Sequence, residues 1–232
     1  MVYGVLLAGG MGTRLGLPVP KQFLKLGSRT LLEHTVEKFA LSEDIVHTVV
    51  VVPENWYEQS YEIIQKLDFS NVSLCVGGKT RQESLYNGLI WLKEHFDIDG
   101  SHIAVSHDVA RPFVTTRMIK DNIEMCKKYG AADTVISSPD TIVNSKNKTT
   151  IFDVPAREEM YLGQTPQTFY IEQFVEIYKH LEPGYLEKVT DAARILSDND
   201  VNVALVKGDV SNMKITTMFD LNVANSILKQ SV

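Results

Sequence analysis

The sequence contains little cysteine and no long apolar run. Its two cysteines, Cys75 and Cys126, lie far apart and outside any C-x-x-C pair, so we expect no disulfide framework and two buried thiols in a cytoplasmic protein. No stretch approaches the roughly 20 apolar residues that a membrane span requires. No charged leader precedes the first apolar run. We therefore expect no membrane association.

An excess of positive charge is also lacking. The formal net charge is −6, which argues against a general nucleic-acid-binding surface but leaves room for a local basic pocket. The apolar fraction of 44% and the charged fraction of 22% are ordinary for a soluble globular protein. Because the chain shows no linker, internal repeat or low-complexity segment, we expect one domain over residues 1–232.

Two common phosphate-binding fingerprints are absent. A P-loop requires G-x-x-x-x-G-K-[ST], and no Lys-Ser or Lys-Thr follows the first glycines at that spacing. The dinucleotide pattern G-x-G-x-x-G is approached by Gly10, Gly12 and Gly16, but the last glycine comes one position late. The acidic residue expected after the second strand is not obvious either, which weakens the case for a dinucleotide-dependent oxidoreductase.

The most informative segment is a glycine-rich turn that carries two cations. Residues 7–14 read Leu-Ala-Gly-Gly-Met-Gly-Thr-Arg, and Pro-Lys-Gln follows at 20–22. Glycines let backbone N–H groups close on an anion, and Arg14 and Lys21 add full positive charge beside them. This combination suits a nucleoside triphosphate that is attacked at its α-phosphorus. A plain tight turn after the first strand is the alternative interpretation.

Strand-like and helix-like segments alternate through most of the chain. This alternation predicts a mostly parallel sheet with helices on both faces, whose ligands sit beyond the carboxyl ends of the strands. The expected strands span 2–7, 48–52, 73–76, 103–106, 132–137 and 203–206. The expected helices span about 30–40, 56–67, 80–95, 115–129, 171–180, 190–197 and 218–228.

Residues 140–153 break the alternation. They suggest two short strands around a polar turn at 145–148, hence a hairpin that projects from the core. Such a hairpin buries its own faces poorly, so we expect it to pack against a second copy of the chain or to form an ordinary surface hairpin.

Two further segments carry candidate chemistry. The turn Gly77–Ser84 leads into a helix, and its free N–H groups and hydroxyls can bind a base, a ribose or a phosphate, or it is simply a capped helix start. Asp108 ends a buried strand, where it is placed to hold Mg²⁺, and Arg111 follows at a distance suited to an acceptor phosphate. The alternative is an Asp–Arg pair that fixes the turn. Single polar residues that favour a structural role when taken alone are Arg157, Thr165, Thr190, Asp191 and Lys214.

The order of the motifs is more specific than any one of them. L-A-G-G-x-G-T-R, P-K-Q-F, G-G-x-x-R-x-x-S, H-D-x-A-R-P, Q-T-P-Q-x-F, T-D-A and N-x-K-I-T-T occur in that order from Leu7 to Asp220. Together they resemble the cytidylyltransferase family, which makes CDP-alcohols from CTP and a polyol phosphate. The resemblance implies a Rossmann-like nucleotidyltransferase fold with a projecting β-hairpin arm at about 139–158, which builds an arm-exchanged homodimer.

The resemblance also implies roles for individual residues. Segments matching the family's CTP site contribute Leu7, Ala8, Gly9, Gly10, Gly12, Gly78, Lys79, Thr80, Arg81, Gln82, Glu83 and Ser84. The expected catalytic cations are Arg14, Lys21, Arg157 and Lys214. The expected acceptor-binding residues are Asp108, Arg111, Thr141, Arg157, Thr165, Thr190 and Lys214, with Asp108 also near Mg²⁺ and the arm residues acting partly across the dimer interface.

The family divides by acceptor. Gly163–Phe169 and Asn212–Thr217 look more like the enzymes that use D-ribitol 5-phosphate for teichoic acid or related polymers, whereas His107–Pro112 lies between these and the enzymes of isoprenoid synthesis. We therefore expect CDP-ribitol and pyrophosphate as products, with 2-C-methyl-D-erythritol 4-phosphate as the alternative acceptor. The ribitol enzymes often work beside a ribulose-5-phosphate reductase.

Proteins of other classes remain as alternatives. An NAD-dependent oxidoreductase shares the strand–glycine–helix opening, and a non-catalytic nucleotide-binding protein would bind CTP without releasing pyrophosphate. A glycosyltransferase usually shows a D-x-D metal motif; the match here, Asp198-Asn-Asp200, falls in a polar turn away from the expected strand ends.

Overall fold

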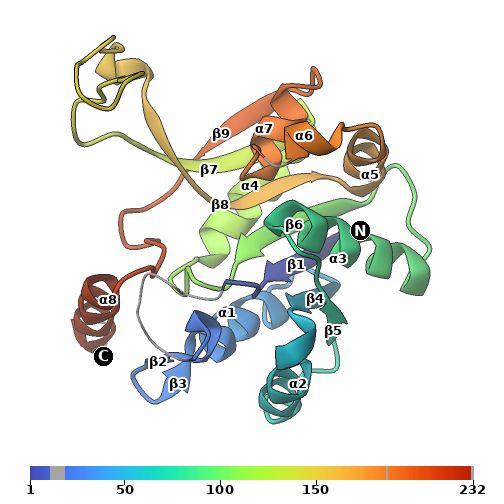
Figure 1. Ribbon diagram of the computed structural model, residues 1–232. Helices are drawn as coiled ribbons and strands as arrows, with labels where there is room; N and C mark the ends of the chain where they lie inside the picture. Colours follow the sequence, from blue (N-terminus) through green and yellow to red (C-terminus); the bar gives the residue numbers. More distant parts are fainter. Residues whose placement is uncertain (11–18, 187, 231–232) are drawn as a thin grey trace.

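The computed structural model describes residues 1–10, 19–186 and 188–230. A seven-stranded sheet crosses the molecule in the order β5-β4-β1-β6-β8-β7-β9 (Figure 1). Strand β8 runs antiparallel to β6 and β7, and the other pairings in this sheet are parallel. The predicted mostly parallel α/β fold is thus confirmed. The strands of the sheet are β1 (Val2–Leu7), β4 (His47–Val52), β5 (Val72–Val76), β6 (Ile103–Asp108), β7 (Ala131–Ser137), β8 (Tyr161–Tyr170) and β9 (Val203–Lys207).

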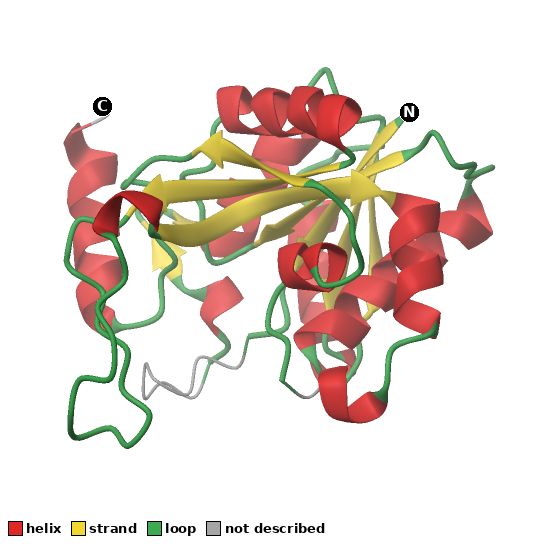
Figure 2. Ribbon diagram, turned by 90° about the horizontal axis from the view of Figure 1, so that it is seen from above, coloured by secondary structure: helices red, strands yellow, loops and turns green. Residues whose placement is uncertain are grey.

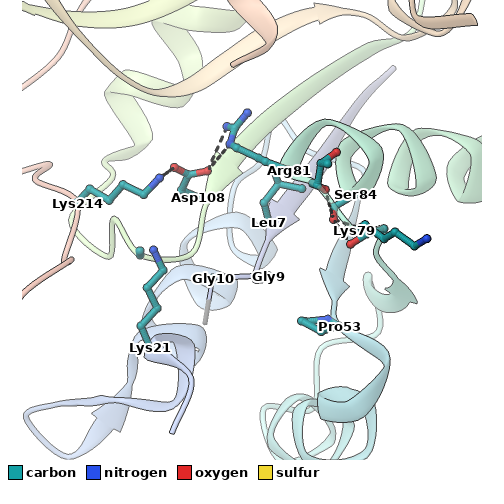
Figure 3. Close-up of a pocket in the computed structure, with 13 residues that line it drawn as sticks. Leu7, Gly9, Gly10, Lys21, Pro53, Lys79, Arg81, Ser84, Asp108 and Lys214 are labelled. Atoms are coloured by element: carbon teal, nitrogen blue, oxygen red, sulfur yellow. Dashed lines mark hydrogen bonds and ion pairs between the residues drawn. The ribbon is translucent and has the colours of Figure 1, made fainter. Parts of the chain in front are cut away.

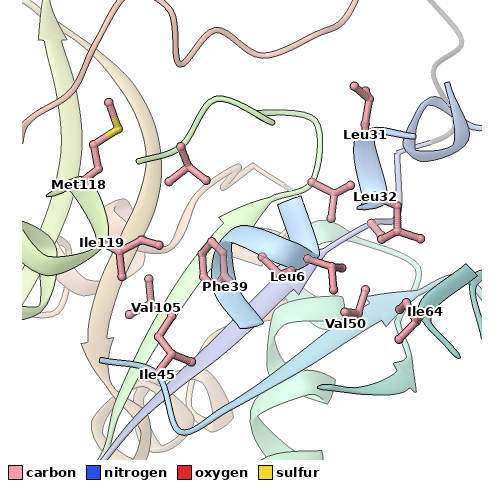
Figure 4. Close-up of a cluster of buried hydrophobic side chains, with 14 of the residues drawn as sticks. Leu6, Leu31, Leu32, Phe39, Ile45, Val50, Ile64, Val105, Met118 and Ile119 are labelled. Atoms are coloured by element: carbon pink, nitrogen blue, oxygen red, sulfur yellow. The ribbon is translucent and has the colours of Figure 1, made fainter. Parts of the chain in front are cut away.

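Helices cover both faces of the sheet because neighbouring strand residues point to opposite sides (Figure 2). Leu6, Val50 and Val105 belong to one core, shown in Figure 4, while the apolar residues beside them in sequence belong to the other. The first core also takes side chains from α1 (Leu31–Ala40), α2 (Tyr57–Gln65) and α4 (Thr116–Tyr129). The second takes side chains from α3 (Arg81–His95), α5 (Ile171–Lys179) and α7 (Ala192–Ser197).

Smaller elements complete the fold. A hairpin of β2 (Lys25–Leu26) and β3 (Arg29–Thr30) precedes α1, and the closing helix α8 (Met218–Gln230) lies against it. Their contact includes a hydrogen bond from the Gly27 amide to Asn225 Oδ1 at 3.1 Å. A four-residue helix, α6 (Pro183–Leu186), precedes α7. Within the described residues, no helix combines the length and the apolar character needed to cross a bilayer.

Local sequence signals explain where several elements begin. Thr30 and Glu33 form a capping box at the predicted start of α1, since Thr30 Oγ1 accepts from the Glu33 amide and Glu33 Oε2 accepts from the Thr30 amide. Cys75 and Cys126 are buried as expected, and burial raises the pKa of both thiols to about 12.

The arm differs from its prediction. The two expected strands within 140–153 are not formed; a single antiparallel bridge between Asn144 and Asp153 closes a loop. Figure 1 shows this segment projecting away from the sheet. The side chain of Asn147 accepts from the amides of Thr149 and Thr150, so its polar turn is satisfied locally rather than by strand pairing.

Strand β8 was not expected from the sequence. It contains Pro166, which removes a ladder donor and normally argues against a strand between two others. A register shift solves this problem: Asp133 pairs with Gln167 and Val135 pairs with Gly163, so three residues of β8 bulge opposite Thr134. The hydroxyl of Thr134 donates to the Pro166 carbonyl at 2.7 Å and bridges the bulge.

Candidate active site

A cavity lies beyond the carboxyl ends of β1, β4 and β6, where the parallel strands deliver their turns to one edge of the sheet (Figure 3). Four of its lining residues are cationic, Lys21, Lys79, Arg81 and Lys214, and they outnumber its one carboxylate, that of Asp108. This excess suits a polyphosphate. The lining residues are Leu7, Gly9, Gly10, Lys21, Pro53, Gly78, Lys79, Thr80, Arg81, Ser84, Asp108, Ala110 and Lys214.

Lys21 is held over the glycine-rich turn. A Cβ placed on Gly10 would collide with Lys21 Cε, and it would lie 2.9 Å from Nζ. The side chain of Lys21 therefore crosses the turn where only a glycine leaves room. In Figure 3 its ammonium points toward the space beside Asp108 and Lys214. Lys21 begins the short helix η2 (Lys21–Phe23), whose buried Phe23 anchors the segment in the first core.

Asp108 binds two cations that are distant in sequence. Its Oδ1 accepts from Arg81 Nε at 3.2 Å, and its Oδ2 accepts from Lys214 Nζ at 2.6 Å. The side chain of Asp108 is only 10% exposed, compared with 24% for Arg81 and 34% for Lys214. Burial alone would raise the pKa of Asp108, but the Arg81 guanidinium and the Lys214 ammonium outweigh burial and hold that pKa well below its usual range.

The segment that carries Lys214 is fixed from both sides. Buried Asn212 donates through Nδ2 to Gln164 Oε1 and to the Thr165 carbonyl, at 3.1 and 2.8 Å. The amide of Ile215 donates to the Ala110 carbonyl at 2.9 Å. Lys214 therefore reaches Asp108 from a well-anchored backbone.

The second glycine turn is more internally bonded than expected. The Gly78 amide donates to Ser84 Oγ, and the Lys79 amide donates to Glu83 Oε2 at 2.7 Å. Thr80 Oγ1 accepts from the Glu83 amide, as a helix cap does. The Gly78 and Lys79 amides are therefore not free as expected, and the binding of CTP by this turn stays a prediction. The turn still forms a wall of the cavity.

A second cavity adjoins the first and shares Arg81, Asp108 and Lys214 with it. It extends from this common wall toward the bulge in β8 and the start of α7. Apart from Gly163, all its lining side chains are polar or charged. The lining residues are Arg81, Asp108, Arg111, Asp133, Gly163, Gln164, Thr165, Gln167, Thr190, Asp191 and Lys214.

Hydrogen bonds fix the turn after β6 beside this second cavity. His107 Nε2 lies 3.0 Å from the Arg111 carbonyl, and its Nδ1 lies 2.8 Å from Thr165 Oγ1. Burial lowers the pKa of His107 to about 4, so the ring is neutral; Nε2 donates to the carbonyl and Nδ1 accepts from Thr165. The Thr165 hydroxyl also accepts from the Asp108 amide. His107 thus positions Asp108 through Thr165 and is not available as a catalytic base.

Arg111 is held by two carbonyls, with NH1 2.9 Å from Asn212 O and NH2 3.4 Å from Gly163 O. It borders the second cavity and also ties the β6 turn to neighbouring segments.

Most of the sequence-predicted site residues meet here, but not all. Ala8, Gln82 and Glu83 do not line the first cavity, and both Ala8 and Gln82 are buried. Thr141 and Arg157 are exposed on the arm and line neither cavity of their own chain. Arg14 and Gly12 lie outside the described residues.

The structure adds residues that the sequence analysis missed. Pro53 and Ala110 form walls of the first cavity because they follow β4 and β6, and position after a parallel strand was the available signal. Asp133 and Gln167 line the second cavity from β7 and β8. Gln167 belongs to the Q-T-P-Q-x-F motif but was given no role, and no motif includes Asp133; their approach depends on the unexpected pairing of those strands.

The expected metal site does not fit the Asp108 carboxylate as it stands. Mg²⁺ requires oxygen ligands, and both oxygens of Asp108 already accept from cations. Among the described residues, no group of three or more acidic, histidine or cysteine side chains is arranged to hold a metal ion. The role of Asp108 as a metal ligand therefore stays a prediction.

Comparison with known proteins gives a consistent result. The sequence model of a family described as IspD, 2-C-methyl-D-erythritol 4-phosphate cytidylyltransferase, matches residues 2–230. A structure from Anaerococcus prevotii named 4-diphosphocytidyl-2C-methyl-D-erythritol synthase is 28% identical, with a TM-score of 0.82 over 98% of this chain and 96% of that one.

Two further solved structures are named 2-C-methyl-D-erythritol 4-phosphate cytidylyltransferase. The one from Francisella tularensis is 28% identical, with a TM-score of 0.81, and the match covers 97% of this chain and 98% of that one. The one from Thermus thermophilus is 28% identical, with a TM-score of 0.74 and coverage of 99% and 100%. The likeness therefore spans essentially the whole domain.

Proposed function

The chain belongs to the IspD family of CTP-dependent cytidylyltransferases, and we propose that its acceptor is the phosphate of a short polyol. The observation that carries this proposal is the common wall between the two cavities, where Arg81, Asp108 and Lys214 border both. Two phosphate-bearing substrates that occupy one cavity each would meet at this wall, beside its cations.

The proposed reaction is an in-line substitution at the α-phosphorus of CTP. An oxygen of the acceptor phosphate forms a bond with that phosphorus while the bond to the bridging oxygen of the β-phosphate breaks, and pyrophosphate leaves. A phosphate monoester is largely ionised near neutral pH, so the attack needs no general base. This agrees with the neutral, internally bonded His107.

The cations would act on the charge that grows in the transition state. Lys21 crosses the glycine turn and lines the first cavity, where it would contact the triphosphate. Lys214 sits at the common wall, where the α-phosphate and the acceptor phosphate meet, and Asp108 orients it together with Arg81. Positive groups held in place before reaction need no reorganisation as charge develops. Arg14 keeps its proposed role as a further cation at the triphosphate.

We also propose a homodimer in which the arm of one copy completes the acceptor site of the other. Thr141 and Arg157 are exposed on the arm, and exposed apolar side chains accompany them. Ile151 is 63% exposed and Phe152 is 60% exposed, which is unusual for large apolar residues that have no partner surface. A ribulose-5-phosphate reductase partner stays a prediction from the sequence resemblance.

The two candidate acceptors have different support. The family description and the names of the similar structures favour 2-C-methyl-D-erythritol 4-phosphate over the acceptor expected from the sequence. The lining of the second cavity is what supports D-ribitol 5-phosphate, because in this chain it is polar or charged apart from Gly163 and suits an acceptor with hydroxyls along its length. The comparisons therefore back methylerythritol 4-phosphate better, and the proposal of ribitol 5-phosphate rests on the polar lining of this cavity.

Pyrophosphate release tests the proposal. Purified protein is assayed with CTP, ATP, GTP and UTP, each with ribitol 5-phosphate or methylerythritol 4-phosphate, in the presence of Mg²⁺. We expect turnover with CTP and a kcat/KM at least tenfold higher for ribitol 5-phosphate. A reversed preference would transfer the proposal to methylerythritol 4-phosphate, and no turnover with either acceptor would refute a polyol phosphate substrate.

Lys21→Ala, with Lys25→Ala as its matched control, tests the cation. Lys25 is an exposed lysine of the adjacent hairpin and lines neither cavity. Removal of a preorganised donor costs about 10²–10³ in kcat, so we expect that loss for Lys21→Ala alone. An increase in the KM for CTP with unchanged kcat would show instead that Lys21 binds the substrate and the transition state equally well.

A further inference from the structure

The second cavity has an unusual electrostatic profile from one end to the other. Arg81, Arg111 and Lys214 stand near the wall that it shares with the first cavity, while Asp133 and Asp191 border it in the region of β7, β8 and the start of α7. A ligand with a phosphate at one end and hydroxyl groups along the rest matches this arrangement, since hydroxyls can donate to carboxylates.

The three carboxylates of this cavity are not equivalent. Asp108 is neutralised by two cations. Asp191 Oδ1 accepts from the Arg194 amide at 2.8 Å and caps α7. Asp133 Oδ1 accepts from Gln167 Nε2 at 3.1 Å, but across the described part of the chain no cation lies within ion-pair distance of it. Asp133 and Asp191 therefore each keep one carboxylate oxygen that accepts from no donor in the described residues, and only Asp133 has its other oxygen held by a side chain of the cavity wall, that of Gln167.

Two features keep Asp133 in place and accessible. Gln167 is itself fixed, since its Oε1 accepts from the Ala192 amide at 3.1 Å, so the amide that holds Oδ1 cannot rotate freely. A Cβ on Gly163 would lie 3.8 Å from Asp133 Oδ2, so the absence of a side chain at Gly163 leaves that oxygen uncovered on this side. The bulge in β8 produces both relations, because it pairs Gln167 rather than Thr165 with Asp133.

We infer that Asp133 is the residue that selects the acceptor, by accepting hydrogen bonds from the polyol hydroxyls remote from the phosphate. This inference rests on the proposed function and names the group that distinguishes a long polyol phosphate from a short one. A buried acceptor that loses its donor costs more than a typical hydrogen bond, so an acceptor too short to reach Asp133 is disfavoured.

The protonation state of Asp133 agrees with this role. Burial, with a smaller contribution from the nearby Asp191 carboxylate, raises the pKa of Asp133 to about 7, while Gln167, Arg111 and Arg81 oppose the rise. The carboxylate is therefore poorly compensated by the protein alone, and hydroxyl donors from a ligand would stabilise its ionised form.

The test compares a long acceptor with a short one. The full-length protein is assayed by pyrophosphate release at saturating CTP, with the better of the two five-carbon acceptors, ribitol 5-phosphate or methylerythritol 4-phosphate, and with glycerol 3-phosphate. Asp133→Leu should lower kcat/KM for the long acceptor at least tenfold and that for glycerol 3-phosphate less than threefold, with the KM for CTP unchanged. Asp133→Asn, which keeps the volume and an oxygen for Gln167, should retain more of the preference than Asp133→Leu. Asp44→Leu, which removes an exposed carboxylate beside the amino end of β4, is the matched control.

The outcomes separate this inference from the proposed function. No turnover by the wild-type protein with any polyol phosphate would refute the function and the inference together. An active wild type whose long-to-short preference is unchanged in Asp133→Leu would refute the inference alone. Equal losses for both acceptors, in both variants, would show that Asp133 only supports the fold around Gln167 and would also overturn it.

Discussion

The position of Lys21 across Gly10 can be tested by a double-mutant cycle. In Gly10→Ala the new Cβ would collide with the end of the Lys21 side chain. Lysine is flexible, so its ammonium would move away from the cavity while the backbone stays where it is. Gly10 is not at a positive φ in the structure, so alanine there adds no backbone strain. The substitution should therefore act on catalysis through Lys21.

The expected magnitude follows from the geometry. Loss of a preorganised donor costs about 10²–10³ in kcat, so Lys21→Ala sets the upper limit. A displacement of about 1 Å of a positioned group can cost about 10²-fold. We expect Gly10→Ala to lower kcat by about 10–10²-fold in the wild-type background. In the Lys21→Ala background nothing remains to be displaced, so the same substitution should change kcat less than about threefold.

The assay is single-turnover pyrophosphate release at saturating CTP, because it isolates the chemical step from product release. Gly9→Ala is the companion variant, since a Cβ at Gly9 meets nothing within 4 Å in the described residues. If alanine at position 9 crowds the triphosphate, Gly9→Ala should raise the KM for CTP by the same factor in the wild-type and Lys21→Ala backgrounds. Additive losses for Gly10→Ala and Lys21→Ala would refute the reasoning, because they would mean that Gly10 acts independently of the lysine.

Three further predictions concern charge and assembly. The folded pKa of Asp108 lies below its unfolded value near 3.8, so its contribution to the free energy of unfolding is present above about pH 4 and is lost as the pH falls; in urea unfolding, Asp108→Asn should flatten the acid limb of the stability profile. The pKa of Asp133 is raised to about 7 in the folded protein. The unfolded chain therefore releases this proton at lower pH, and the free energy of unfolding falls as the pH rises from about 4 to 7. Asp133→Asn should remove that fall, and an unchanged stability profile in this variant would contradict the raised pKa. Phe152→Ser, at a 60% exposed arm residue, should shift sedimentation toward the monomer and raise the acceptor KM, whereas a wild type that sediments as a monomer would exclude the proposed arm exchange.

The parallel half of the fold was predictable because its signals are local. The β-branched run at 48–52 predicts β4, and the capping pair Thr30 and Glu33 marks the start of α1 to within a residue. The glycine-rich turn could also be assigned to the carboxyl end of β1, since ligand sites of such sheets lie at that edge.

The antiparallel half was less predictable because it depends on pairing between distant segments. Nothing around Pro166 indicates a strand between two others, and the bulge that accommodates the proline appears only when β7 and β8 pair. For the arm, the prediction was wrong in the opposite direction, because strands were expected and are not formed. Its sequence resembles a hairpin, but without a surface to pack on it forms one bridge, between Asn144 and Asp153.

The candidate site follows the same division. Lys21 and the glycine turn are visible in the sequence as one motif. The link between Arg81 and Lys214 is not visible in the sequence, because it exists only through Asp108. Arg81 comes from α3, Lys214 from the segment before α8, and Asp108 from the end of β6. Taken alone, Lys214 favoured a structural role, whereas its ion pair with Asp108 brings it to the cavity wall.

The arrangement of charge explains how a chain with a net charge of −6 can bind two anionic substrates. Its positive groups gather at the common wall, where Asp108 holds two of them at a fixed separation from the strand ends. If those cations were unpaired, their side chains could bind either substrate in many positions. The ion pairs with Asp108 hold each side chain in one position. Asp133 lies beyond them, in the second cavity only, and its negative charge would repel a phosphate placed at that position. Attraction at the wall and repulsion beyond it therefore orient the acceptor with its phosphate toward the triphosphate, which is the orientation that transfer of the cytidylyl group requires.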